Sequence, residues 1–220
     1  MAMPPAAWIA RSRIVSFHTY LYGFVAARIE PVNTQLYGIM ADDRLTSLDW
    51  VNAGLKALAK SGFTALKADT LSKVLGVSRG SFYWHFADVG AFHAAVLQRW
   101  REIAYENVVR EVEGAPENRL AALLDRAFRA DVRLEMAVRS WATAEARAKT
   151  MVEAVDSRRL KYIRELLTEA GLTLNQASAR ARILYWAYLG HGLSAHKPDP
   201  AEWRRILDEL ARLATAAKTA

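Results

Sequence analysis

The stretch KADTLSKVLGVSRGSFYWHF, residues 67–86, decides the fold. It contains two short helical patterns, about Ala68 to Leu75 and Ser78 to Trp84, separated by Gly76 and Val77. Glycine suits the tight turn after the first helix because it adopts positive φ without a steric penalty. Val77 is apolar and can fill the angle between the two helices. Two short helices joined in this way predict a helix-turn-helix.

Apolar and polar side chains in this stretch separate onto opposite faces. The pattern predicts that Leu71, Val74 and Leu75 face inward from the first helix. Phe82 and Phe86, four residues apart, are expected to face inward from the second helix. We expect Ser78 to cap that helix by accepting a hydrogen bond from its first backbone N–H groups. The residues left on the outer face or at its edge are Arg79, Gly80, Ser81, Tyr83 and Trp84.

The outer residues have the chemistry of DNA recognition. A recognition helix presents its N-terminal residues to base edges in the major groove, where arginine pairs bidentately with guanine. Gly80 would let the backbone approach DNA closely, and Tyr83 and His85 can donate to phosphate oxygens. The alternative is an ordinary helical hairpin in which Tyr83, Trp84 and His85 serve only packing.

The run GVSRGSFYWHF, residues 76–86, resembles the TetR/AcrR family of regulators. Family members show a G-V-S-x-x-x-[LIF]-Y-x-H-F pattern at this place, and the resemblance covers about residues 46–95. It implies that Arg79 to Ser81 read bases and that Tyr83 and His85 hold phosphates. The positions that match the pattern are Gly76, Val77, Ser78, Phe82, Tyr83, His85 and Phe86.

Two positions depart from the family pattern. Lys67 stands where members often have a threonine that caps the second helix and touches phosphate, although lysine can still reach phosphate. Val89 stands where a lysine is common, so that phosphate contact is expected to be missing. The predicted DNA-binding residues are Lys67, Ser78, Arg79, Gly80, Ser81, Tyr83, Trp84 and His85.

The rest of the chain after Met40 reads as helical, and we predict an all-α fold with nine helices. The apolar residues Leu48, Val51, Leu55, Leu58 and Ala59 mark the inner face of the first helix, about Thr46 to Lys60. Asp88 is expected to cap a long helix that ends near Gly114. Further helices are expected at about 117–130, 132–144, 147–170, 173–195 and 200–217. Residues 44–90 then form a three-helix helix-turn-helix DNA-binding domain, and residues 91–220 a helical-bundle ligand and dimerisation domain.

Bulk composition supports a globular protein with a polyanionic partner. Hydrophobic residues make up 52% and charged residues 24%, and the net charge of +7 favours nucleic acid or an anionic membrane surface. The absence of cysteine excludes disulfides, cysteine-based zinc sites and thiol catalysis, and is compatible with the cytoplasm. There is no phosphate-binding glycine loop, H-E-x-x-H or G-x-S-x-G motif, and the five histidines are scattered. We predict no enzymatic activity, cofactor or metal site.

Residues 1–43 form an N-terminal extension with three interpretations. Arg11 and Arg13 precede an apolar run from Ile14 to Ile29, as in a secretory signal or membrane anchor. Polar residues interrupt the run, so an additional helix is favoured over an anchor, and a membrane partner is not expected. The third interpretation is that Met40 is the biological start.

The C-terminal part is expected, from the resemblance, to hold a small-molecule effector and a dimer interface. Ile183, Ala187, Gly190 and Leu193 in one helix, with Ile206, Leu210 and Leu213 in the next, are predicted to form a two-fold four-helix interface. The alternatives are that these faces pack within one subunit, and that the aromatic residues are core. The candidate ligand-binding residues are Phe128, Met136, Trp141, Tyr162, Tyr185, Trp186, Tyr188 and His191.

A basic cluster at Arg158, Arg159, Lys161 and Arg164 has acidic neighbours, so we expect a solvated, salt-bridged helix face there. Together these features predict a ligand-responsive repressor that binds a palindromic double-stranded DNA operator as a homodimer. The competing hypotheses are a helical protein-interaction module that has lost DNA binding, an all-helical enzyme acting on a small molecule, and a regulator anchored to a membrane through residues 8–29.

Overall fold

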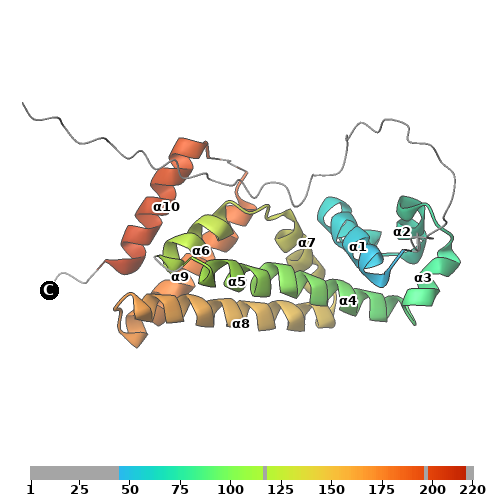
Figure 1. The fold of residues 1–220 in the computed structure, drawn as a ribbon, viewed down its shortest axis with the longest axis horizontal. Coiled ribbons are helices and arrows are strands. Elements are labelled where there is room, and N and C mark those ends of the chain that lie inside the picture. Colours follow the sequence, from blue (N-terminus) through green and yellow to red (C-terminus); the bar gives the residue numbers. More distant parts are fainter. Residues whose placement is uncertain (1–44, 116–117, 196–197, 217–220) are drawn as a thin grey trace, which may run out of the picture. The chain divides into compact units, whose positions relative to one another are not determined.

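The computed structural model describes residues 45–115, 118–195 and 198–216. The predictions for residues 1–43 fall outside these ranges. All regular structure in the described residues is helical, which confirms the all-α prediction. The helices are α1 (Ser47–Ser61), α2 (Ala68–Leu75), α3 (Arg79–His85), α4 (Val89–Arg101), α5 (Asn107–Glu113), α6 (Arg119–Phe128), α7 (Arg133–Ala142), α8 (Ala146–Glu169), α9 (Leu174–Leu193) and α10 (Pro200–Thr215), with a short 3₁₀ helix, η2 (Phe63–Ala65), and a π-helical turn, η3 (Glu102–Glu106) (Figure 1).

Local sequence signals explain where the first helices begin and end. Thr46 and Asp49 form a capping box at the start of α1, in which each side chain accepts a hydrogen bond from the other residue's backbone N–H. Gly76 ends α2 in the left-handed conformation, with φ of 70°, as the predicted turn requires. Asp88 caps α4 by accepting a 2.6 Å hydrogen bond from the backbone of Ala91, as expected.

Three details of the predicted helix-turn-helix were wrong. Leu48 is 50% exposed because it lies at the edge of the α1 face whose buried line includes Trp50 and Leu58. Val74 is 68% exposed because α2 packs through Ala68, Leu71 and Ser72, on its other side. Ser78 occupies the N-cap position of α3, but its side chain makes no capping hydrogen bond.

A long helix runs from Val89 through η3 to Glu113, and it ends at Gly114 as predicted. The π-helical turn in its middle was not predicted. In Figure 1 this long helix lies alongside α8, and α4 and η3 both contact α8. A π-turn inserts an extra residue per turn and frequently marks a functional site.

The first hydrophobic core joins the helix-turn-helix to the bundle behind it. Phe82 from α3 and Phe92 from α4 are fully buried in it, as is Trp50 from α1. The same core includes Val138 and Trp141 from α7 and reaches α8. A movement of the bundle would therefore be transmitted directly to the packing of α1 and α3.

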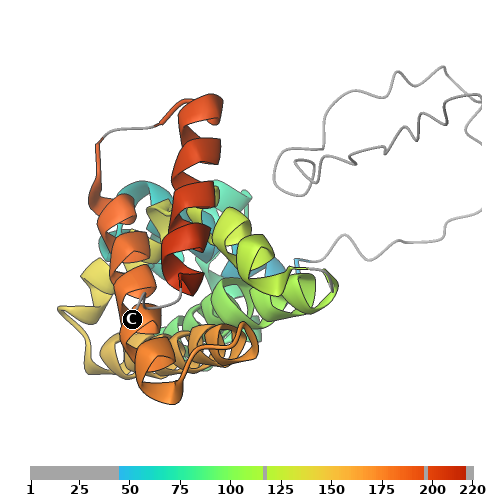
Figure 2. The ribbon, with the colours of Figure 1, turned by 90° about the vertical axis from the view of Figure 1, so that its left-hand side faces the viewer.

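A second core lies among α6, α8, α9 and α10. Leu124 and Phe128 from α6 pack there with Leu184 from α9 and Leu207 from α10. Figure 2 shows α10 beside α6 and α9, and both pairs of helices are in contact. The last helix is thus held by one face, which leaves its other side chains available for other contacts.

Candidate nucleic-acid interface

Helix α3 is anchored by one aromatic side chain and exposes the rest of its surface. Phe82 is fully buried, with its ring centroid 5.3 Å from those of Trp50 and Phe92 and 5.2 Å from that of Phe86. Edge-to-face ring contacts of this kind stabilise a defined orientation. The anchor holds α3 with its outer residues toward solvent.

The predicted outward residues lie where the sequence pattern placed them. Tyr83 is 48% exposed and Trp84 is 88% exposed, an unusual degree for a tryptophan. Arg79 and Gly80 are also exposed, and Ser81 is partly buried. Helix α3 therefore presents a cation, an open backbone position and two aromatic rings on a single surface.

Arg79 is held by two neighbours. Its Nε lies 3.2 Å from Oδ1 of Asp69 in α2, and its Nη2 donates a 3.4 Å hydrogen bond to the Tyr83 hydroxyl. The hydrogen bond with Tyr83, followed by the charge of Asp69, raises the pKa of the Arg79 guanidinium above its ordinary value. The sequence analysis did not identify Asp69, although its carboxylate stands ten residues before Arg79 in the sequence.

The remaining predicted DNA-binding residues flank this surface. Lys67 is exposed at the N-cap of α2 without capping the helix, so its side chain can extend toward a phosphate. Ser78 is exposed at the start of α3, and His85 is partly buried near its end. Val89 packs against the first core, as an apolar residue at this position should.

A largely buried polar network lies behind the helix-turn-helix. Arg159 of α8 pairs with Glu135 of α7 at 2.9 Å, with side-chain exposures of only 12% and 5%. Arg159 also donates to the backbone carbonyl of Ala104, within η3, at 3.0 Å. The Arg139 guanidinium forms ion pairs with the carboxylates of Glu135, at 2.8 Å, and Asp156, at 2.5 Å. The network thus connects α7 and α8 to the π-turn of the long helix.

This network corrects the prediction for the basic cluster of α8. Arg158 and Lys161 are exposed, as expected of a solvated face, but the Arg159 side chain is only 12% exposed. Burial lowers the pKa of Arg159, yet the charge and hydrogen bonds of Glu135 outweigh it and raise the pKa overall. The one sequence signal was that Glu135 shares a helix face with Val138 and Trp141.

Three predicted ligand-binding residues gather at the second core. The Phe128 ring centroid lies 6.1 Å from that of Tyr188 and 5.9 Å from that of His191. Trp203 of α10, which was not predicted, lies 4.8 Å from His191. Burial raises the pKa of Tyr188 to about 12. These residues combine aromatic surface with hydrogen-bonding groups, as ligand sites do.

Two further candidates lie beside this group. Tyr185 stacks near Tyr188 with centroids 6.1 Å apart, and its hydroxyl donates to Asp156 in the buried network. Met136 lies close to Gly192 of α9, where an added Cβ would come within 2.6 Å of the Met136 Cε. The candidates Phe128, Met136, Tyr185, Tyr188 and His191 therefore belong to one region of the bundle.

The other three ligand candidates lie elsewhere. Trp141 is buried in the first core, where it stacks on Phe63 with centroids 4.8 Å apart. Tyr162 donates a 2.7 Å hydrogen bond to Glu113 at the far end of the long helix. Trp186 is 60% exposed on the outer face of α9. The structure does not bring them together with the Phe128 group.

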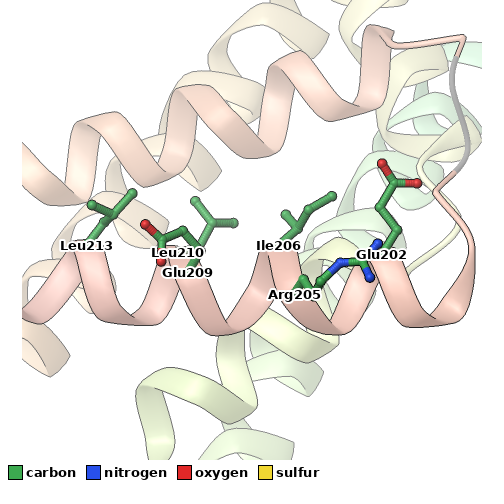
Figure 3. A pocket seen from close by; sticks show the side chains of 6 residues that line it. All are labelled: Glu202, Arg205, Ile206, Glu209, Leu210 and Leu213. Atoms are coloured by element: carbon green, nitrogen blue, oxygen red, sulfur yellow. The ribbon is translucent and has the colours of Figure 1, made fainter.

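The outer face of α9 carries an exposed apolar stripe, which we call the α9 stripe: Ile183, Trp186, Gly190 and Leu193. Ile183 is 58% exposed and Leu193 is 79% exposed. On α10, an open groove of about 540 Å³ is lined by Glu202, Arg205, Ile206, Glu209, Leu210 and Leu213. Figure 3 shows Ile206, Leu210 and Leu213 projecting from one side of α10 toward α9. Of the two faces predicted for dimerisation, Ile183, Leu193 and Leu213 are exposed, whereas Ala187 on α9 and Leu210 on α10 pack against the second core within the same chain.

The described ranges contain neither a candidate membrane span nor a candidate metal site. None of the helices there combines the length and the apolarity needed to cross a bilayer. In the same ranges, no three His, Cys, Asp or Glu side chains come together in a way that could hold a metal ion.

Residues 51–88 match the sequence family described as bacterial regulatory proteins, tetR family. No curated protein matches the chain. This family is one of regulators, in agreement with the prediction that the chain is not an enzyme.

Several solved structures share the fold. The reduced form of NemR from Escherichia coli is 18% identical, with a TM-score of 0.57 over 74% of this chain and 94% of that chain. A TetR-family protein from Streptomyces coelicolor A3 is 21% identical, with a TM-score of 0.53 over 73% and 95%. The multidrug binding protein EbrR, complexed with imidazole, is 20% identical, with a TM-score of 0.52 over 74% and 93%.

Proposed function

We propose that this chain, whose residues 51–88 match the tetR family of bacterial regulatory proteins, is a ligand-responsive repressor that binds a palindromic operator as a homodimer. The observation that carries the proposal is the exposed surface of α3, where Arg79, Tyr83 and Trp84 stand on a helix anchored by Phe82. Arginine reads guanine in the major groove, and the tyrosine hydroxyl can donate to phosphate. Because the proposed partner is operator DNA, we expect the protein to act in the cytoplasm.

Dimerisation through α9 and α10 would give the protein a two-fold symmetry that matches the palindromic operator. The α9 stripe spaces its members three and four residues apart, which aligns them on one side of the helix. Its exposed Trp186 and Leu193 are large apolar side chains of the kind that an interface covers. Two copies of α3 must then lie about 34–36 Å apart to enter successive major grooves.

We assign residues 91–220 to effector binding and dimerisation, and residues 44–90 to DNA binding. A small molecule would bind near Phe128, Tyr188 and His191, and the imidazole bound to EbrR shows that one protein of this fold holds a small molecule. If the small molecule binds more tightly when α4 is in one of two positions, effector binding and DNA binding become coupled. Such a coupling free energy is typically about 1–3 kcal/mol. The first core and the Arg159–Ala104 contact are the physical links between the two regions.

The test is a fluorescence titration of the full chain against duplexes selected from random sequences, at two salt concentrations. Binding should be sequence-dependent and should weaken as salt rises, because phosphate contacts release counterions. Substituting both Arg79→Ala and Tyr83→Ala should abolish selective binding. The matched control is Arg129→Ala, since Arg129 is also an exposed arginine paired with an aspartate.

The alternative is a helical interaction module that has lost DNA binding, for which the valine at position 89 is the supporting feature. Failure of the full chain to enrich any duplex would overturn the repressor proposal in favour of this alternative. Sedimentation of the full chain should give a dimer, and Trp186→Asp should give a monomer. A monomeric wild type would remove the two-fold operator from the proposal.

A further inference from the structure

The surface that carries the recognition arginine also carries a carboxylate. Asp69 lies in the first turn of α2, two residues after Lys67, and its side chain is 63% exposed. A negative charge facing a phosphate backbone opposes DNA binding of every sequence. Any benefit of Asp69 to recognition must therefore lie in something other than the overall affinity for DNA, which its charge lowers.

The benefit lies in how Arg79 is held. The Oδ1 atom of Asp69 lies 3.2 Å from Nε of the Arg79 guanidinium, and the Tyr83 hydroxyl accepts a 3.4 Å hydrogen bond from Nη2. The guanidinium has five N–H donors in a planar fork, so these two contacts leave donors of Nη1 and Nη2 for a third partner. The guanidinium carbon also lies 6.0 Å from the centre of the Tyr83 ring. Two neighbours on different helices thus restrain the plane of the group.

A restrained plane matters for base recognition. Pairing with guanine needs two parallel N–H donors directed at O6 and N7 at once. A free arginine side chain must lose its rotamer freedom to reach this geometry, and prior restraint lowers that loss. A restrained guanidinium is also less able to turn toward a phosphate in a random sequence.

We propose that Asp69 is a positioning residue that orients Arg79 toward guanine and so increases the discrimination between operator and random DNA. The inference rests on the proposed DNA binding and adds to it a residue that acts through Arg79. Asp69 lowers affinity for random DNA by its charge and sharpens base preference by its contact with Nε. Its predicted target is the guanine that Arg79 reads.

A merely structural role for Asp69 has a different signature. Negative charges in the first turn of a helix interact favourably with the helix dipole, and Asp69 lies in the first turn of α2. Loss of this effect would lower the melting temperature slightly and leave the preference for each base unchanged. Base preference, measured separately from stability, therefore separates the two roles.

The experiment compares the full wild-type chain with Asp69→Asn on three kinds of duplex: the selected operator, versions of it with each guanine replaced in turn, and random DNA. Asp69→Asn should bind random DNA more tightly, and its ratio of operator to random affinity should fall roughly tenfold. The lost preference should fall on one guanine per half-site. The matched control is Asp125→Asn, which removes a carboxylate of similar exposure on α6, paired with Arg129, and should leave the ratio unchanged.

A double-mutant cycle shows whether Asp69 acts through Arg79. In an Arg79→Ala background, Asp69→Asn should no longer change the preference at that guanine. An unchanged ratio in Asp69→Asn, or the same loss in both backgrounds, would overturn the inference while wild-type operator binding upheld the proposed function. A wild type that selects no operator would overturn both.

Discussion

Two arginine–carboxylate pairs in this protein have similar distances and opposite surroundings. Arg79 and Asp69 lie 3.2 Å apart with side-chain exposures of 62% and 63%, whereas Arg159 and Glu135 lie 2.9 Å apart at 12% and 5%. Water and salt screen an exposed pair, which contributes about 0–1 kcal/mol. A buried pair leaves an uncompensated charge when one partner is removed. The exposed pair is thus accessible to DNA, whereas the buried pair stabilises the packing of α7 against α8.

The buried pair should give the largest effect on stability. We expect Glu135→Ala to lower the free energy of unfolding by about 3–5 kcal/mol, because it leaves the Arg159 guanidinium buried without its main partner. Urea unfolding at a fixed protein concentration measures this loss. Asp69→Ala serves as the comparison and should cost less than about 1 kcal/mol. Equal losses in the two variants would mean that burial does not distinguish the pairs.

The exposed pair should give the next effect, on binding and not on stability. Arg79→Ala should weaken operator binding by about 1–3 kcal/mol, since it removes a bidentate base contact. The same variant should keep the wild-type urea midpoint because the Arg79 side chain is 62% exposed. A drop in stability comparable to that of Glu135→Ala would contradict the assignment of Arg79 to recognition.

An exposed contact can still affect stability when it satisfies backbone groups. Thr46→Ala should lower the free energy of unfolding by about 0.5–2 kcal/mol, because it removes the cap of α1. Thr173→Ala at the similar capping box of α9 should cost a comparable amount. Thermal melts of both variants measure the effect, and no change in either would show that these caps are replaced by water.

The smallest effect concerns pH. The side-chain hydrogen bond with Thr46 is the main cause that lowers the pKa of Asp49 below its ordinary value. A carboxyl group with a lowered folded-state pKa stabilises the protein above its unfolded-state pKa, and that contribution disappears as pH falls through the folded-state value. The difference in melting temperature between wild type and Asp49→Asn should therefore shrink from pH 6 to about pH 3. A difference that stays constant over this range would rule out the carboxylate as its source.

The helix-turn-helix was predicted closely because its signals are local. Gly76 at a turn, Asp88 at a helix start, and Phe82 and Phe86 four residues apart each act within one or two turns of the chain. The same periodicity failed for Leu48 and Val74, since the apolar face of a short helix is wider than the surface that its neighbours cover.

The helical bundle behind the helix-turn-helix was predicted less well, because its side-chain environments depend on contacts between segments far apart in the sequence. Arg159 was predicted to be solvated because charged residues surround it in sequence, yet it meets Glu135 and the Ala104 carbonyl from two other helices. Trp186 was predicted to contact ligand with Tyr185 and Tyr188, but it follows Tyr185 by about 100° around the helix and so lies on the exposed side of α9.

By itself, the sequence determined the all-α fold, the helix boundaries near residues 46–88 and the outward set of α3, because caps, turns and helical periodicity depend on neighbours along the chain. Only the tertiary structure decided that Asp69 restrains Arg79, that Glu135 and Arg159 are buried together, and that the helix from Val89 contains a π-turn. These features arise where helices far apart in sequence pack, and a side chain's burial and partner are properties of that packing.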